Sequence, residues 1–174
     1  MADLLPGFDA PAQPRPRNWH NYADYRVVHE RQTDALVERG VVVTQTLEFL
    51  EQYSSVTRAL ERVHLAGRIA LSSGALMDID KWLGVRDHNG RAEVVTDVYS
   101  YHAWMVDSEG AEFPILRYDN ADDDDLASLH RHRFYTDGTQ RERTEPVAAD
   151  RMPYLNEVIE EADRIGWAHP LCSN

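Results

Sequence analysis

The sequence has almost no lysine. Lys81 is the single lysine among 18 Lys and Arg residues, whereas Asp and Glu number 30 and the net charge is −12. An acidic surface built with arginine and almost without lysine is typical of extreme halophiles, and an Arg-rich genome of high GC content is the alternative explanation. Because about 1 M salt shortens the Debye length to about 3 Å, the acidic total does not exclude an anionic partner such as nucleic acid.

Cysteine and long apolar runs are also scarce. Cys172 is the only cysteine, which excludes an intramolecular disulfide. No run approaches the roughly 18 apolar residues of a membrane span, and the N-terminus lacks a basic start followed by an apolar stretch. At 174 residues the chain suits one domain. We therefore expect a cytoplasmic protein that does not enter the membrane.

Motifs for bound cofactors are missing too. The sequence contains no Gly-rich phosphate loop, no nucleophile elbow, no Cys/His zinc pattern and no dinucleotide fingerprint. We expect no cofactor.

Apolar spacing predicts helices near both ends of the chain. Residues 1–18 contain four of the eight prolines, so we expect an extended arm there. Spacings of three and four predict a helical region at 29–63, divided by Gly40 into helices near 29–39 and 43–63. This region is a candidate surface for a homo-oligomer. A C-terminal helix is predicted at 153–165.

Strand signals fill the middle of the chain. Residues 64–135 alternate apolar and polar positions, with hairpin turns predicted at Asn89-Gly90 and at Asp107–Gly110. The prediction is a single α+β domain at 19–174. In it, an antiparallel β-meander of about four to five strands packs against the N-terminal and C-terminal helices.

The segment from Phe113 to Tyr135 concentrates the side chains that can carry chemistry. A cation, a phenol, a carboxylate and an amide end a strand, four aspartates follow, and two histidines then alternate with two arginines. These residues are Arg117, Tyr118, Asp119, Asn120, Asp122–Asp125, His130, Arg131, His132 and Arg133. On a strand, Arg117 and Asp119 share a face, as do His130 and His132.

Two chemistries fit this segment. In the first, the two histidines act as general acid and base, and Arg117, Arg131 or Arg133 binds a phosphodiester. RNA is then the natural substrate, because its 2′-hydroxyl is an internal nucleophile. In the second, His130, His132 and one of the nearby aspartates hold a divalent metal. In a third interpretation the segment has no chemical role. Arg117 to Asn120 then only stabilise a turn, and Asp122–Asp125 is a solvated acidic loop.

The order of these features resembles the TumE-like toxin family of prokaryotic toxin–antitoxin systems. The resemblance covers about residues 64–166 and rests on the strand YSYHAWMV, the run ILRYDNA at Ile115–Ala121, and His130-Arg131-His132. It implies a small intracellular toxin that acts on nucleic acid and is neutralised by an antitoxin protein. The resemblance assigns functional roles only to the residues at 117–120 and to His130 and His132.

The leading hypothesis is a metal-independent ribonuclease or related RNA-directed toxin. Its catalytic residues would be His130, His132, Arg117, Tyr118 and Asp119, and its phosphate contacts Arg131, Arg133 and Asn120. The alternative is a non-catalytic, halophilic binding or assembly protein on the same fold. Convergence of the histidines and Arg117 in one place would favour chemistry, and their dispersal would favour the alternative.

Overall fold

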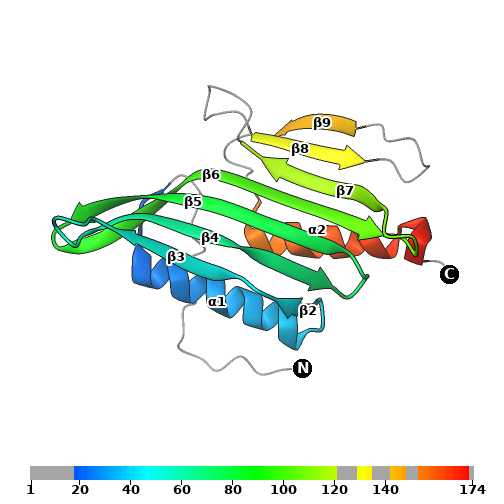
Figure 1. The fold of residues 1–174 in the computed structure, drawn as a ribbon, viewed down its shortest axis with the longest axis horizontal. Helices are drawn as coiled ribbons and strands as arrows, with labels where there is room; N and C mark the ends of the chain where they lie inside the picture. Colours follow the sequence, from blue (N-terminus) through cyan, green and yellow to red (C-terminus); the bar gives the residue numbers. More distant parts are fainter. Residues whose placement is uncertain (1–17, 121–128, 135–141, 148–152, 173–174) are drawn as a thin grey trace, which may run out of the picture.

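A computed structural model of the chain describes residues 18–120, 129–134, 142–147 and 153–172. The extended arm predicted at 1–18 therefore lies outside the described residues, apart from Asn18. Strands dominate the fold, as Figure 1 shows. In chain order the elements are β1 (His20–Asn21), α1 (Tyr22–Glu38), β2 (Val42–Gln45), β3 (Glu48–Tyr53), β4 (Leu60–Leu71), β5 (Leu76–His88), β6 (Arg91–Val106), β7 (Glu112–Asp119), β8 (Leu129–Phe134), β9 (Glu142–Val147), α2 (Leu155–Trp167) and a 3₁₀ turn, η2 (Pro170–Cys172).

All described strands belong to one antiparallel sheet of nine strands, so the prediction of about four to five strands with prominent helices is wrong. The main order is β2-β4-β5-β6-β7-β8-β9, with β3 also paired to β4 and β1 to β6. Sequence analysis missed β1, which has two residues, and β9, which lies where a loop was expected. The predicted turns at Asn89-Gly90 and Asp107–Gly110 are confirmed as the β5–β6 and β6–β7 connections.

The helix predicted at 43–63 is the largest error in the N-terminal half. β2, β3 and the start of β4 occupy this range. Two side chains of the predicted apolar stripe are largely exposed: Val43 is 62% exposed and Val56 88%. Alternate residues of β4, from Val63 and Leu65 onward, are buried instead. The β-branched residues between 41 and 46 favour this outcome.

A close approach at Gly67 lets β2 and β3 share one edge of β4. β3 pairs with the first half of β4 and β2 with its last residues. Where the chain passes from one to the other, a Cβ at Gly67 would lie 2.5 Å from the carbonyl oxygen of Thr46, and Gly67 has a φ of +150°. Only glycine therefore allows this crossing.

Local capping sets the limits of α1. The side chain of Asn21 accepts a hydrogen bond from the backbone N–H of Asp24 at 3.2 Å. At the other end Gly40, with a φ of +73°, donates to the carbonyl of Val37. The helix predicted at 29–39 thus exists but begins earlier, at Tyr22. Since no helix follows it, the helical surface on which self-association through 29–63 was predicted is present only in part.

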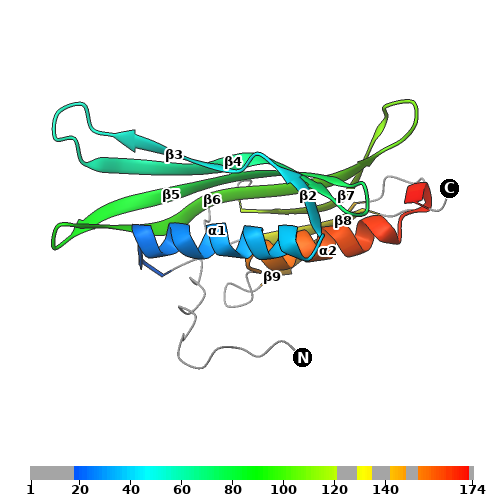
Figure 2. The same cartoon turned by 90° about the horizontal axis from the view of Figure 1, so that it is seen from below.

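Both helices lie on one side of the sheet, which curves around them (Figure 2). We call this side the inner face and the opposite side the outer face. The main core lies between the inner face and α2, where Val158, Ile159 and Ala162 pack with Tyr101 and Leu116. None of the described helices is long and apolar enough to cross a membrane.

The β4–β5 turn anchors α2. Asp163 accepts hydrogen bonds from the hydroxyl of Ser72 and the backbone N–H of Ser73, both at 2.9 Å. One turn later Gly166 approaches the same turn so closely that a Cβ would lie 2.3 Å from Ser73 Oγ. The C-terminal helix predicted at 153–165 is thus present with shifted ends, and Gly166 lies within α2, where it serves helix packing.

A bulge in β7 decides which side chains reach each face. The β6–β7 register shifts so that Leu116 pairs with Ala103 and Pro114 with Trp104. Ile115 is the extra residue, and both it and Leu116 are buried. The alternation predicted from Phe113 is thus reset at the bulge, and Arg117, Tyr118 and Asp119 follow in regular alternation.

Candidate functional site

An ion-pair network on the outer face joins three of the predicted residues. Asp119 is 0% exposed, and its Oδ2 lies 2.7 Å from Arg117 Nε and 3.2 Å from His132 Nε2. Neighbouring strands create this contact, because Arg117 of β7 pairs with His132 of β8. Neither oxygen of Asp119 makes a hydrogen bond within the described residues, so these two ion pairs compensate its buried charge.

The second nitrogen of His132 points to β9. His132 Nδ1 lies 3.3 Å from the hydroxyl of Thr144, whose side chain is exposed, and the two residues pair across β8 and β9. With the carboxylate of Asp119 beside Nε2, the contacts assign the proton to Nε2 and the lone pair to Nδ1. The His132 imidazole thus lies between a carboxylate and a hydroxyl.

Two further histidines border this network. The ring of His130 lies 6.2 Å from that of His132, on the same face, and is partly exposed. His102 of β6 pairs with Arg117. Burial lowers the pKa of His102, and the charge of Arg117 lowers it further. We refer to Arg117, Asp119, His130, His132 and Thr144 as the outer cluster.

The remaining predicted residues face the helices. The hydroxyl of Tyr118 donates to Glu161 of α2 at 2.9 Å, and Arg131 forms an ion pair with the same carboxylate. Glu161 also lies 3.8 Å from Arg133, and Glu145 of β9 lies 3.7 Å from Arg131. Burial raises the pKa of Tyr118. We refer to Tyr118, Arg131, Arg133, Glu145 and Glu161 as the inner cluster.

Asn120 ties the end of β7 to β6. Its side-chain oxygen accepts from the backbone N–H of Tyr99 at 2.8 Å, and its amide donates to the carbonyl of Asp97 at 2.9 Å. Asn120 is only 5% exposed. Its side chain therefore holds two strands in register next to the outer cluster, whereas sequence analysis assigned it to phosphate.

The structure brings the predicted site residues together in two groups. Arg117, Asp119, His130 and His132 share the outer face, while Tyr118, Arg131 and Arg133 are separated from them by the sheet. Thr144 was not among the residues predicted from the sequence, because β9 lies beyond the sheet predicted at 64–135. Because side chains alternate between the two faces of a strand, the sequence of β8 already indicates that its histidines and its arginines point to opposite faces.

The described residues contain no group of three His, Cys, Asp or Glu side chains arranged to hold a metal ion. Asp122–Asp125, the other carboxylates of the metal hypothesis, lie outside the described residues. The carboxylate that does meet an imidazole, Asp119, contacts Arg117 as well.

Comparisons of the chain with family models, with curated proteins and with solved structures find no match.

Proposed function

We propose that this protein is a metal-independent, RNA-directed ribonuclease of the TumE-like toxin type, with its site at the outer cluster. The observation that carries the proposal is that Arg117 and His132 contact the buried carboxylate of Asp119 and that His130 lies beside His132. Two imidazoles and a guanidinium can supply a base, an acid and a phosphate contact without a metal ion. The expected partner is an antitoxin protein.

His132 is the base in this proposal. It removes the proton from the 2′-hydroxyl of RNA through Nδ1, and the 2′-oxygen attacks the adjacent phosphorus. The P–O5′ bond breaks, and His130 donates a proton to the leaving 5′-oxygen. Arg117, whose side chain is 34% exposed, offers its guanidinium to the charge that develops on the phosphate oxygens. The products are a 2′,3′-cyclic phosphate and a 5′-hydroxyl.

Asp119 and Thr144 act through His132. The Asp119 carboxylate holds the proton on Nε2 and stabilises the imidazolium that forms when Nδ1 accepts a proton. The Thr144 hydroxyl lies beside Nδ1 and can pass the proton to it. We no longer propose that Arg131 and Arg133 bind phosphate, because both lie near the carboxylate of Glu161 on α2.

The competing function is a non-catalytic binding or assembly protein. The inner cluster favours it locally, because Tyr118 and Arg131 there anchor a helix. On the outer face no helix of the described chain covers the histidines, which favours chemistry. Catalysis is therefore proposed only for the outer cluster.

The test is cleavage of a fluorophore–quencher RNA oligonucleotide in molar salt, with and without EDTA. We expect cleavage that EDTA leaves unchanged and no cleavage of the 2′-deoxy oligonucleotide. A His130→Ala, His132→Ala variant should lose at least a hundredfold in rate, because acid–base groups contribute typically 10²–10⁴-fold. The same variant should no longer inhibit growth of the host.

Controls separate lost chemistry from lost folding. His88→Ala alters an exposed histidine of the β5–β6 hairpin and should keep full activity. His132→Asn is the milder change if the double variant unfolds, and circular dichroism checks each variant. Loss of cleavage in EDTA would support the metal hypothesis instead. Full activity of a folded double variant, or no cleavage by the native chain, would contradict the proposed function.

A further inference from the structure

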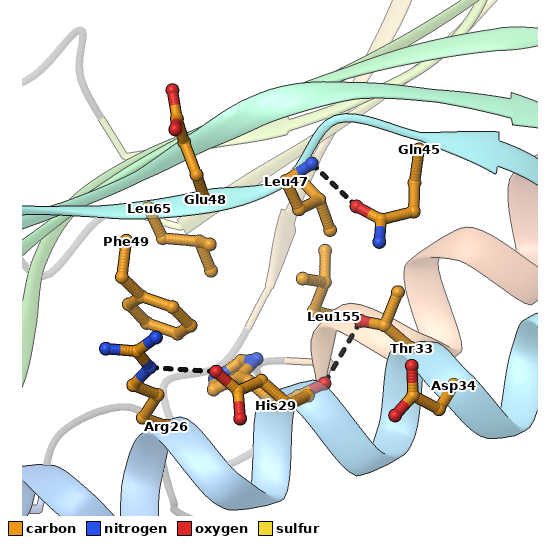
Figure 3. A pocket seen from close by; sticks show the side chains of 11 residues that line it. Arg26, His29, Thr33, Asp34, Gln45, Leu47, Glu48, Phe49, Leu65 and Leu155 are labelled. Carbon is orange, nitrogen blue, oxygen red and sulfur yellow. Dashed lines mark hydrogen bonds and ion pairs between the residues drawn. The ribbon is translucent and has the colours of Figure 1, made fainter.

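A cavity of about 530 Å³ opens between α1 and the β2–β3 edge of the sheet, away from the outer cluster. Figure 3 shows it from close by. One wall is α1, whose contributing residues recur at three- and four-residue steps and so lie on one side of the helix. The opposite wall is the segment from Gln45 to Phe49, with Leu65 of β4 behind it and Leu155 of α2 at one end.

The cavity lining combines apolar side chains with polar and charged ones. Leu47, Phe49, Leu65 and Leu155 supply apolar surface. His29 is only 8% exposed, and its ring lies 4.5 Å from that of Tyr25. No hydrogen bond to the His29 ring is present among the described residues. Because buried polar groups normally have a hydrogen-bond partner, this nearly buried ring can offer a nitrogen to a molecule in the cavity.

The charges at the cavity oppose an anion. Among the lining residues Arg26 is the only cation, and it forms ion pairs with Glu30 at 2.8 Å and with Glu51 at 3.5 Å. Asp34 and Glu48 form no ion pair within the described residues. The His29 ring adds no positive charge near neutral pH, since burial lowers its pKa well below the usual range and the nearby charge of Lys81 acts in the same direction.

The side chains of Asp34 and Glu48 are oriented differently relative to the cavity. In Figure 3 Asp34 lies beside Thr33 on α1, at the end of the cavity where Gln45 descends from the opposite wall, whereas Glu48 points away from the gap. A positive group bound at that end would meet the Asp34 carboxylate. The apolar remainder of the ligand would then lie between Phe49, Leu65 and Leu155.

We propose that this cavity binds a small organic amine, with its apolar body in the interior and its ammonium group beside Asp34. The volume falls within the roughly 300–1,000 Å³ of small-molecule sites. The apolar side chains and the His29 ring provide contacts, and the carboxylate of Asp34 selects a cation over an anion. The site is independent of the proposed ribonuclease activity.

Isothermal titration calorimetry with 2-phenylethylamine tests the proposal, and 3-phenylpropionate serves as the matched anion. The amine should bind at least tenfold more tightly than the anion, because reversal of one charge beside a carboxylate changes attraction into repulsion. Asp34→Asn should remove most of this preference, whereas Glu48→Gln, which alters the carboxylate that points away, should keep it. Leu47→Trp should fill the cavity and abolish binding of both compounds.

Thermal unfolding of each variant confirms that the chain is folded, and both carboxylates are exposed, so their replacement should leave the fold intact. No binding of the amine to the native chain would overturn the proposal. Equal affinity for amine and carboxylate would do the same, as would a preference that survives Asp34→Asn or binding that survives Leu47→Trp.

Discussion

The strand residues of the outer and inner clusters alternate along the same strands, β7, β8 and β9, yet the two clusters have opposite surroundings. On the outer face Arg117 and His132 converge on a carboxylate of β7 itself, and Thr144 is exposed. On the inner face Tyr118 and Arg131 converge on Glu161, a carboxylate supplied by α2. The first group is internal to the sheet, and the second joins the sheet to a helix.

This difference shows that residue type alone does not separate a binding group from an anchor. Arg117 and Arg131 have the same side chain and are neighbours across the β7–β8 ladder. An arginine becomes an anchor when an opposing element places a carboxylate against it, as α2 does for Arg131. The inner cluster should therefore govern stability, and the outer cluster should govern any activity.

The largest expected effect comes from removing the shared carboxylate of the inner cluster. Glu161→Ala leaves the Tyr118 hydroxyl without this acceptor and Arg131 with only the more distant Glu145, at a site where the Glu161 side chain is only 13% exposed. We expect the free energy of unfolding to fall by about 3 kcal/mol. Urea denaturation measures this loss.

Glu160→Ala is the matched control for Glu161→Ala. Glu160 precedes Glu161 on the same helix but forms its ion pair with Arg39 at the surface, where both side chains are more than 40% exposed. Surface pairs contribute about 0–1 kcal/mol, so this variant should stay close to the native stability. An equal loss from both changes would remove the distinction between the inner cluster and an ordinary surface pair.

A smaller effect is expected on the outer face, and on activity instead of stability. Thr144→Val keeps the shape of the side chain but removes the hydroxyl beside His132 Nδ1. We expect RNA cleavage to slow about tenfold, which corresponds to about 1.4 kcal/mol of transition-state stabilisation. The midpoint of urea unfolding should hardly move, because the Thr144 side chain is exposed. If the variant were destabilised but cleaved RNA at the normal rate, Thr144 would have a structural role and no role in catalysis.

The sequence was sufficient to locate the outer cluster but not to divide it from the inner one. The spacing of His130 and His132, and of Arg117 and Asp119, correctly placed each pair on one face. What could not be predicted is that Glu161, which lies in a different element near the end of the chain, would meet Tyr118 and Arg131. That contact depends on how α2 docks, which long-range packing decides.

The errors in the fold have a similar origin. Val43 and Val56 fit a helical stripe by spacing, but a stripe is meaningful only if its residues are buried, and both are exposed. β2 and β3 exist because β4 offers an edge to pair with and Gly67 lets the chain cross it closely. Backbone pairing of this kind leaves little trace in local periodicity, in contrast to the Asn89-Gly90 turn, which is encoded by the two residues that form it.

The smallest expected effect concerns the pKa of His102, which burial lowers and which the Arg117 charge lowers further. Since the unfolded chain takes up this proton near the ordinary value of about 6.5, it binds more protons than the folded chain just below that pH. The contribution of His102 to stability is therefore complete above about pH 6.5 and is lost as the pH falls below it. Arg117→Gln should raise the pKa of His102 toward the ordinary value and weaken this pH dependence, while burial keeps the pKa lowered in part.

An NMR titration of the His102 ring, together with urea unfolding between about pH 5 and pH 7, measures both effects. Arg133→Gln is the matched control. It also removes one arginine charge, but from the inner face of the sheet, where Arg133 lies near Glu161. If the two faces are electrostatically separate, only Arg117→Gln shifts the titration of His102. Equal shifts from both variants would mean that charge on the inner face acts across the sheet, and the two clusters would then have to be treated as one.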